Sequence, residues 1–453
     1  MAHYKSPIHY RPKEGVLADT IPFYWEGEYH IFYLRGSIGK VPWEHIVSSD
    51  LVHWKELPTA LVSDGDPNGP DGEHMFTGSV IEKDGTFHIF YTGWNPRNDK
   101  GREFVMHATS PDLITWTKHP EDIIGPDGIL YANHKDRDWR DPYVFWNEEE
   151  KQYWMVVIAN GVKQSHAVQG LLVSDDLKTW KHEPPLEGAD GQECPDLFKI
   201  DDTYYLIGGD HYSYAKNIRG PYRQPKHSVI DRPGVYAAKR MFDGKRHIWT
   251  GWVWDTNNLK DEGQGIWGGY QCLPREIYAG PDGQLFCRPA PEVTNVFNKK
   301  ILDLGLKPHL DTSAGTVQWG YDAGNIVGKS GSQCRIDVPD NYMLQLEVLM
   351  NSQTEFSIMM REQEDTREGY CLILRPNKQE LVLSGTRNGV IIDTTKPVKI
   401  MAFVQGTVIE CFVNDAYAFT RRAYNLSGGK LGLNISEGKA QILELSVKTD
   451  LKA

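Results

Sequence analysis

A seven-residue pattern, Ser-x-Asp-Leu-x-x-Trp, occurs three times in the first half of the chain and constrains its fold more than any other feature. The copies lie at residues 48–54, 110–116 and 174–180, so they start 62 and 64 residues apart. A fixed period of this kind indicates a repeat architecture. Runs rich in aromatic and β-branched residues, such as FHIFYTGW and YWMVVIAN, lie between the copies and are bounded by Gly, Asp or Asn. These runs predict short strands joined by turns.

A repeated unit of about 60 residues that holds several short strands is typical of a β-propeller blade. Five such β-rich runs between residues 20 and 260 predict five blades. A two-sheet sandwich with similar turns is the alternative, and the phased motif favours the propeller. Beyond residue 295 the motif stops, and runs such as YMLQLEVLMN alternate apolar with polar residues, which indicates half-buried antiparallel strands. We therefore expect an all-β chain with a five-bladed β-propeller at 1–295, a linker at 296–304 and a β-sandwich at 305–453.

The charge of the chain argues against two classes of partner. The formal net charge is −12 over 453 residues, and no basic run is present. Nucleic acids and anionic membrane surfaces attract basic proteins, so we expect neither as a partner. No apolar run is long enough to cross a bilayer, and the N-terminus lacks the apolar core of a signal peptide. These features predict a cytoplasmic protein, with export open if a leader had been removed.

The cysteines and histidines predict neither a disulfide framework nor a metal site. The 16 His are spread along the chain without His-Glu-x-x-His spacing, and no P-loop sequence (Gly-x-x-x-x-Gly-Lys-Ser/Thr) is present. We expect no cofactor and no metal. The cysteines lack Cys-x-x-Cys spacing and are expected to be buried or free thiols. They are Cys194, Cys272, Cys287, Cys334, Cys371 and Cys411.

Three acidic residues lie near the start of three of the predicted blades. Asp19 precedes the first strand of blade one, Asp141 that of blade three and Glu193 that of blade four. Residues at equivalent positions of propeller blades converge on the central axis, so we expect the three carboxyl groups to meet there. Glycoside cleavage requires two carboxyl groups that flank the scissile bond. Each residue alone has an ordinary structural explanation, and the matched phase of all three favours a catalytic site.

The segment WRDPYVFW contains Arg-Asp-Pro, and the segment ECPDLF contains Glu-Cys-Pro-Asp-Leu. With these two motifs the chain resembles glycoside hydrolase family 32, the β-fructofuranosidases, invertases and fructan hydrolases. FTGSVIEKDGTFHIFYTG is similar to its Phe-Ser-Gly-Ser segment, and the similarity extends over nearly the whole chain. The resemblance implies cleavage of terminal β-fructofuranosyl linkages in a small fructoside or a fructan.

The resemblance also implies roles for individual residues. Asp19 would be the nucleophile of a retaining mechanism, Glu193 the acid and base, and Asp141 the residue that stabilises the transition state. A covalent route needs the Asp19 and Glu193 carboxyls about 5–5.5 Å apart, whereas inversion needs roughly 6.5–9.5 Å. Further residues match substrate-binding positions, although ordinary core packing also explains some of them. These residues are Trp43, Phe76, Thr77, Arg140 and Cys194.

The segment Asp66-Pro67-Asn68-Gly69 spells the family's nucleophile motif, but it follows the first copy of the repeat and is predicted to be a surface or rim loop. At the matching position the chain has Ala18-Asp19-Thr20-Ile21-Pro22, so the usual amide before the nucleophile is missing. Leu34 replaces a usual Gln, and Glu44 a usual Gly. A pocket that loses polar partners is expected to bind a different sugar, or to bind it differently.

Four functions remain open at this stage. The first is hydrolysis of β-fructofuranosides, and the second is fructosyl transfer, in which another sugar replaces water. The third is hydrolysis of another furanoside, such as an arabinofuranoside. The fourth is carbohydrate binding without catalysis, which the presence of all three carboxylates disfavours. The expected partner is a small carbohydrate, and the β-sandwich is a possible surface for homo-oligomer formation.

Overall fold

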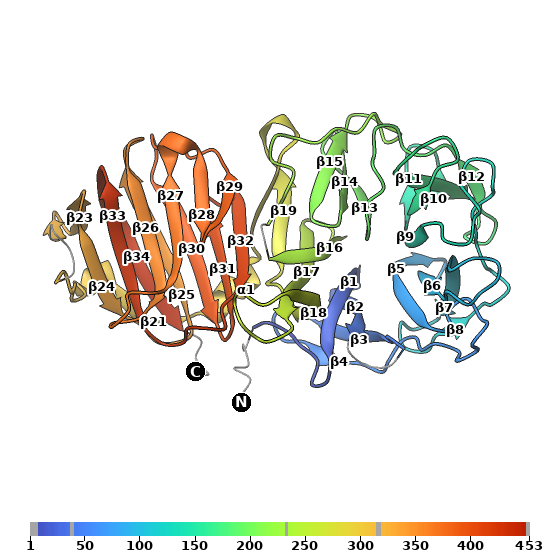
Figure 1. Cartoon of the computed structure of the whole chain (residues 1–453), viewed down its shortest axis with the longest axis horizontal. Coiled ribbons are helices and arrows are strands. Elements are labelled where there is room, and N and C mark those ends of the chain that lie inside the picture. The colour runs from blue at the N-terminus through green and yellow to red at the C-terminus, as the bar shows by residue number, and fades with distance from the viewer. Residues whose placement is uncertain (1–7, 37–39, 232–233, 314–318, 450–453) are drawn as a thin grey trace.

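Antiparallel β-strands form nearly all of the regular secondary structure. The structure, a computed structural model, describes residues 8–36, 40–231, 234–313 and 319–449. Two bodies lie side by side: the strands from β1 to β20 form one, and the strands from β21 to β34 form the other (Figure 1). The all-β class predicted from the sequence is confirmed.

The first body contains four antiparallel sheets. Three of them follow the chain in simple order, each strand pairing with the next. Their strands are β5 (His74–Lys83), β6 (Thr86–Trp94), β7 (Glu103–Ser110), β8 (Thr117–Lys118), then β9 (Trp139–Asn147), β10 (Gln152–Asn160), β11 (Ala167–Ser174), β12 (Lys181–Glu183), and β13 (Asp196–Ile200), β14 (Thr203–Gly208), β15 (His211–Ala215).

The fourth sheet joins the beginning of this body to its end, because β1 pairs with β18 at Leu17 and Gly269. It runs in the order β20-β19-β17-β18-β1-β2-β3-β4, with β16 on the other side of β17. Its strands are β1 (Val16–Trp25), β2 (Glu28–Gly36), β3 (Trp43–Ser48), β4 (Lys55–Glu56), β16 (Val235–Phe242), β17 (His247–Thr256), β18 (Gly265–Gln271), β19 (Arg275–Ala279) and β20 (Leu285–Pro289).

Each copy of the Ser-x-Asp-Leu-x-x-Trp motif forms the turn between the third and fourth strand of a sheet. In the first copy the Asp50 carboxylate accepts hydrogen bonds from the backbone N–H groups of Val52 and His53 at 3.0 and 2.8 Å. Asp112 and Asp176 accept equivalent bonds in the other copies. The carboxylate fixes the turn because it replaces backbone partners that the chain cannot supply there. The motif thus encodes one turn, used three times.

The tryptophan of the motif also fixes how neighbouring sheets pack. Trp116, from the sheet that begins with β5, meets Phe32 on β2 of the preceding sheet edge to face, with ring centres 5.8 Å apart. Trp180 meets Phe90 on β6 in the same way, at 5.5 Å. Edge-to-face pairs of aromatic rings have a preferred geometry. The sheets that begin with β5 and β9 are therefore each set against the preceding sheet by the same contact.

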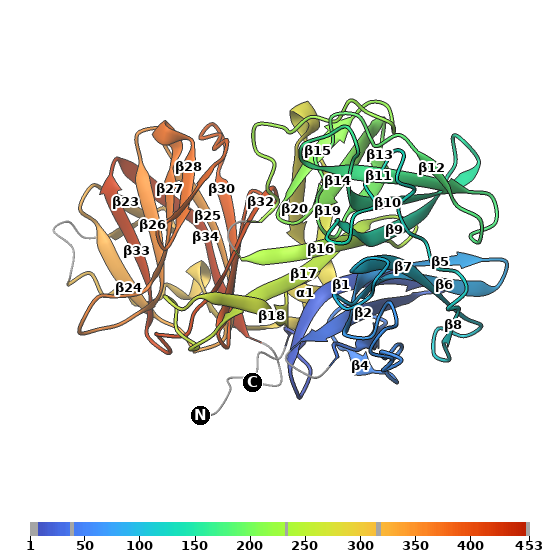
Figure 2. The ribbon, with the colours of Figure 1, turned by 45° about the vertical axis from the view of Figure 1, so that its right-hand side comes forward.

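The strands β1, β5, β9 and β16 lie next to one another at the centre of the first body: β1 contacts β5 and β16, and β5 contacts β9 (Figure 2). Each of the four has a bulge against its neighbouring strand. The bulges fall at Asp19, Thr77, Asp141 and Ala237. Bulges bend a strand and re-aim side chains, and they are frequent next to active sites.

The second body consists of two sheets that enclose one hydrophobic core. An eight-stranded sheet has the order β22-β23-β34-β25-β30-β31-β32 with β21 on β34, and a six-stranded sheet has the order β24-β33-β26-β27-β28-β29. Their strands are β21 (Lys299–Asp303), β22 (Gly320–Asp322), β23 (Asn325–Lys329), β24 (Gln333–Asp337), β25 (Tyr342–Met350), β26 (Glu355–Glu362), β27 (Tyr370–Arg375), β28 (Glu380–Leu383), β29 (Thr386–Gly389), β30 (Val398–Gln405), β31 (Val408–Val413), β32 (Tyr417–Arg422), β33 (Lys430–Glu437) and β34 (Lys439–Thr449).

Helical structure is confined to short segments between strands. Within the described ranges it comprises α1 (Pro291–Val296) and the 3-10 turns Pro281–Gly283, Leu304–Leu306 and Pro376–Lys378. No helix in this part of the chain has the length and apolar content needed to span a membrane. The expected linker at 296–304 includes strand β21, which pairs with β34 of the second body. The domain boundaries at 295 and 305 stay a prediction.

A buried ionic network joins the two bodies. Arg275 on β19 is fully buried; it pairs with Asp231 and donates hydrogen bonds to Glu410 on β31 at 2.6 Å and to Thr420 on β32 at 2.7 Å. His9 contacts the other oxygen of Glu410 at 3.0 Å. The buried carboxylates of Asp231 and Glu410 are tolerated because the planar guanidinium of Arg275 pairs with both of them.

We predict that Arg275→Met lowers the free energy of unfolding by about 3–5 kcal/mol, because it leaves two buried carboxylates without their cation. The measurement is urea unfolding followed by tryptophan fluorescence. Arg288→Met is the matched control, because Arg288 pairs with Glu276 at 2.6 Å but its side chain is half exposed. The control is expected to lose less than about 1 kcal/mol. Equal losses in the two variants would contradict the importance of the buried network.

Candidate active site

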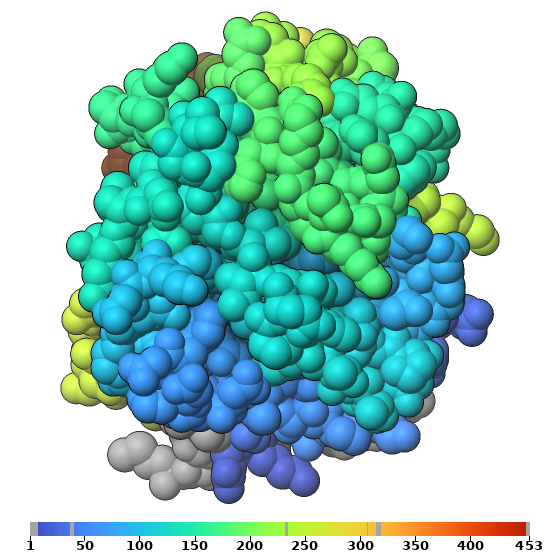
Figure 3. Space-filling view, turned by 90° about the vertical axis from the view of Figure 1, so that its right-hand side faces the viewer, coloured from blue at the N-terminus to red at the C-terminus, as the bar shows by residue number. Residues whose placement is uncertain are grey.

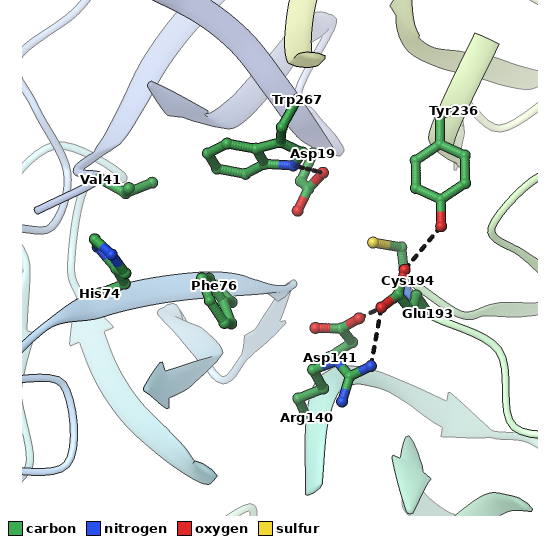
Figure 4. A pocket seen from close by; sticks show the side chains of 10 residues that line it. All are labelled: Asp19, Val41, His74, Phe76, Arg140, Asp141, Glu193, Cys194, Tyr236 and Trp267. Carbon is green, nitrogen blue, oxygen red and sulfur yellow. Dashed lines mark hydrogen bonds and ion pairs between the residues drawn. The ribbon is translucent and has the colours of Figure 1, made fainter. Parts of the chain in front are cut away.

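A cavity of about 560 Å³ opens among the bulged strands. Carboxyl groups lie on one side and aromatic rings line much of the rest (Figure 4). The residues that line it are Asp19, Val41, His74, Phe76, Arg140, Asp141, Glu193, Cys194, Tyr236 and Trp267. All three carboxyl residues predicted from the repeat phase are therefore brought together, along with Phe76, Arg140 and Cys194. The other two predicted binding residues, Trp43 and Thr77, do not line the cavity.

Asp19 lies in the bulge of β1, with a positive φ of 35° and 9% of its surface exposed. Two indole N–H groups, from Trp252 and Trp267, donate hydrogen bonds to its Oδ1, each at 3.2 Å. Burial raises the pKa of the Asp19 carboxyl to about 7, and the nearby charge of Asp141 adds to this increase. The two indoles and the buried Lys239 ammonium act in the opposite direction and favour the carboxylate.

Asp141 occupies the equivalent bulge of β9, with a φ of 62° and 3% exposure. Its Oδ2 accepts a hydrogen bond from the backbone N–H of Cys194 at 2.9 Å, and its own N–H donates to Thr92 Oγ1 at 2.8 Å. Burial raises the pKa of the Asp141 carboxyl to about 6, and the adjacent Arg140 guanidinium limits the increase. The backbone thus fixes the position of this carboxyl from two sides.

Glu193 differs from the two aspartates because 44% of its side chain is exposed. It lies just before β13 and is held by two donors: Arg140 Nη2 at 2.9 Å from its Oε1, and the Tyr236 hydroxyl at 2.7 Å from its Oε2 (Figure 4). A carboxyl that reaches solvent through the cavity can exchange protons with it. The cavity therefore combines two buried carboxyls with a third that is open to water.

The residues beneath the cavity support its lining. Lys239 is buried, and its Nζ donates to the carbonyl oxygen of Gly78 at 2.6 Å and to Thr77 Oγ1 at 3.3 Å. The Trp43 indole donates to the carbonyl oxygen of Phe76 at 3.1 Å, which fixes the backbone under the Phe76 ring. Trp43 and Thr77 thus act on the site through their neighbours rather than by contact with the cavity.

The departures from the family pattern lie away from the cavity. Ala18 and Leu34 are fully buried cross-strand partners, and Thr20 donates its hydroxyl to the carbonyl oxygen of Thr250 at 2.9 Å. The Glu44 carboxylate lies 3.1 Å from Arg35. None of the four altered residues lines the cavity. The expectation that these departures alter sugar binding stays a prediction.

Asp66 forms a local turn and does not line the cavity. Its Oδ1 accepts a hydrogen bond from the backbone N–H of Asn68 at 3.0 Å, and its carbonyl oxygen accepts one from Gly69 at 3.1 Å. Its side chain is exposed. These bonds are those of an Asx turn, as expected for this segment.

Several lining residues were missed from the sequence. Trp267, Tyr236, His74 and Val41 belong to no motif that the sequence analysis singled out. A partial signal existed for Tyr236, because it lies at the bulge of β16. Trp267 had a weaker sequence signal than Tyr236. Its strand, β18, is not one of the four bulged central strands and is connected to them through its pairing with β1.

Three carboxyl groups in an aromatic-walled cavity define a site of the type that cleaves glycosidic bonds. The family model of the glycosyl hydrolases family 32 N-terminal domain matches residues 9–289. The chain therefore belongs to glycosyl hydrolase family 32, as the motifs indicated.

Individual relatives agree with this assignment. An insoluble β-fructofuranosidase isoenzyme of Arabidopsis thaliana is 28% identical in an alignment of 357 positions, which covers 66% of this chain and 59% of that protein. The sucrose-6-phosphate hydrolase of Escherichia coli is 26% identical in an alignment of 464 positions, gaps included, which covers 91% of this chain and 87% of the relative. The chain thus spans less than two thirds of the length of the first of these relatives.

The fold is shared with a solved structure over nearly the whole chain. Fructan 1-exohydrolase IIa from Cichorium intybus, solved in complex with 1-kestose, aligns with a TM-score of 0.77 at 19% identity. The alignment covers 99% of this chain and 98% of the other. At this identity the likeness shows a common architecture for both bodies.

We predict that two aspartate carboxyls titrate far above the usual range, with midpoints near 7 for Asp19 and near 6 for Asp141. The measurement is a ¹³C NMR titration of the chain labelled at its aspartate carboxyls. The Asp19→Asn and Asp141→Asn variants identify the resonance of each residue. Lys239→Met is expected to raise both midpoints by about one pH unit, because a buried cation is lost. Lys245→Met, at an exposed turn, is the control. Midpoints near 4 for both aspartates would contradict the electrostatics.

Proposed function

We propose that the chain is a retaining glycoside hydrolase that releases terminal β-fructofuranosyl units from a fructoside or a fructan. The observation that carries the proposal is the cavity in which buried Asp19 faces the same space as the solvent-open Glu193. The family membership and the named relatives, a β-fructofuranosidase and a sucrose-6-phosphate hydrolase, support it.

The proposed reaction proceeds in two displacements. Ionised Asp19 attacks the anomeric carbon and forms a covalent ester as the bond to the leaving oxygen breaks. Glu193 gives its proton to that oxygen. The Glu193 carboxylate then takes a proton from water, whose oxygen attacks the anomeric carbon and releases Asp19. The exposure of Glu193 suits this double role, because both the leaving group and the incoming water reach the site from the cavity.

The remaining residues of the site have proposed supporting roles. Asp141 is held from two sides and would accept hydrogen bonds from sugar hydroxyls, with Arg140 beside it. Two indole donors favour the ionised form of Asp19, which the attack requires. Phe76 and Trp267 offer ring faces to the C–H faces of the sugar.

The architecture proposed for this function is a five-bladed β-propeller. The blades would be β1–β4, β5–β8, β9–β12, β13–β15 and β16–β20, with the first and last joined through the β1–β18 pair. The repeated Trp–Phe contact between sheets and the central position of the bulged strands support this division. Homo-oligomer formation through the sandwich and a cytoplasmic location stay predictions.

We predict that Asp19→Ala lowers the release of fructose by at least about 10⁴-fold, because the nucleophile is lost. Asp66→Ala is the matched control and is expected to retain activity within about twofold, since Asp66 only stabilises a turn. The measurement is free fructose from sucrose, 1-kestose, inulin and levan. Transfer instead of hydrolysis would appear as longer oligosaccharides in place of free fructose.

Loss of fructose release in Asp66→Ala, with release retained in Asp19→Ala, would overturn the assignment of Asp19 as the nucleophile. No release from the whole panel by the unmodified chain would overturn the fructosidase proposal. Other furanosides would then be assayed, and calorimetry would test for binding alone. A binding protein would retain its sugar affinity after Glu193→Gln, whereas an enzyme would lose turnover.

A second prediction concerns pH. Asp19 must be ionised to attack, and its pKa in the empty site is raised to about 7. The value of kcat/KM is therefore expected to fall as the pH decreases through about 7, by about tenfold for each further pH unit. The measurement is the pH profile of initial rates at substrate concentrations well below KM. A profile that stays flat from pH 8 to pH 5 would contradict the proposed role of Asp19.

A further inference from the structure

The hairpin formed by β17 and β18 links the nucleophile to the second body. Its strands carry Trp252 and Trp267, whose indoles both donate to Asp19. Its turn, at residues 257–264, reaches the opposite way and contacts the sandwich. The hairpin lies between the two bodies (Figure 2). One element therefore contacts the catalytic carboxyl at one end and the C-terminal sheets at the other.

Trp267 is weakly held by its own sheet. The register of β18 against β17 shifts there: Ile266 faces Asp255 and Gly269 faces Trp254, so Trp267 and Gly268 have no partners on β17. Gly268 has a φ of 93°, and a side chain on it would meet Val16 at 2.5 Å. Trp267 thus lies in a bulge near the turn of the hairpin. Trp252, by contrast, is fully buried in the middle of β17.

The turn of the hairpin is anchored to the sandwich by Asp261. Its Oδ2 accepts a hydrogen bond from the hydroxyl of Tyr370 on β27 at 2.6 Å. Its Oδ1 accepts one from the backbone N–H of Tyr424 at 2.7 Å, and its own N–H donates to Asn425 Oδ1 at 3.2 Å. Three bonds from one residue, all crossing between the bodies, fix the turn in place.

These contacts are additional to those that dock the two bodies. The Arg275 network joins β19 to β31 and β32 and is fully buried, whereas the Asp261 side chain is 16% exposed at the edge. The Arg275 network already docks the two bodies, so we infer a different effect for the hydrogen bonds of Asp261. They limit the movement of the ends of β17 and β18 next to the turn, and Trp267 lies only two residues beyond Gly265, where β18 begins.

We propose that the C-terminal sandwich is part of the catalytic apparatus, because Asp261 and Tyr370 position Trp267 over Asp19. Both act through the hairpin and are positioning residues, while Trp267 makes the contact with the nucleophile. The proposal rests on the proposed function for its kinetic consequences. The structural part, that the sandwich sets the environment of Asp19, stands on the hydrogen bonds alone.

A double-mutant cycle tests the path from Asp261 to Trp267. Asp261→Ala is expected to lower kcat by roughly tenfold with KM changed less, because a small misplacement at the reacting centre is costly. In the Trp267→Phe background, Asp261→Ala is expected to change kcat by less than about twofold, because the hydrogen bond from Trp267 to Asp19 is already absent. Equal effects in both backgrounds would overturn the proposal and leave Asp261 a merely structural residue.

Tyr370→Phe is a milder test of the same path from Asp261 to Trp267, and it has a matched control. It removes the hydroxyl that bonds to Asp261, and it is expected to lower kcat by about threefold. Tyr278→Phe is the control: the Tyr278 hydroxyl also crosses between the bodies, donating to the carbonyl oxygen of Asp415 at 2.5 Å, but it does not touch the hairpin. The control is expected to leave kcat unchanged. Equal losses in the two variants would overturn the proposal.

A spectroscopic titration separates this inference from the proposed function. Protonation of Asp19 changes the fluorescence of the two indoles bonded to it, and the difference between the chain and its Asp19→Asn variant isolates this signal. The signal is expected to change in midpoint or amplitude after Asp261→Ala and to stay constant after Tyr278→Phe. Unchanged titrations in both would overturn the inference even in an active enzyme. A change without any turnover would support the inference and overturn the fructosidase proposal.

Discussion

The bulges in β1, β5, β9 and β16 are the constraint on which the site depends. A regular strand directs successive side chains to opposite faces of its sheet, so it cannot aim Asp19 or Asp141 along the strand into a central cavity. In the bulges of β1 and β9 the backbone turns into positive φ, at 35° for Asp19 and 62° for Asp141. That conformation is unfavourable for a residue with a side chain, and the flanking sheet pairs hold it in place.

Two buried carboxyls beside each other would repel unless the surroundings compensated them. Here the compensation comes from parts of the chain far apart in sequence: Lys239 from β16, two indoles from the β17–β18 hairpin and the N–H of Cys194. It is incomplete, and burial still raises both pKa values. Glu193 is open to solvent by contrast. Carboxyls in such different environments can take different roles in one reaction.

The sequence was informative where a short segment determines its own structure. The Ser-x-Asp-Leu-x-x-Trp turn is local, since Asp50 bonds to residues two and three positions later, and its repetition revealed the phase that placed Asp19, Asp141 and Glu193 together. Contacts between sheets left no such signal. Trp267 reaches Asp19 across 248 residues, and Lys239 reaches Gly78 across 161. Ala18 and Leu34 are buried partners across β1 and β2, and the effect of these changes on sugar binding stays a prediction.

The two bodies depend on each other for reasons that differ in kind. The Arg275 network ties the bodies together by a buried ion pair, and removal of Arg275 would leave Glu410 buried without that cation. The Asp261 contacts are fewer and more exposed, yet they lie on the element that reaches Asp19. A strongly bound interface fixes the relative position of the bodies, and on that fixed base a few hydrogen bonds suffice to set the place of one indole.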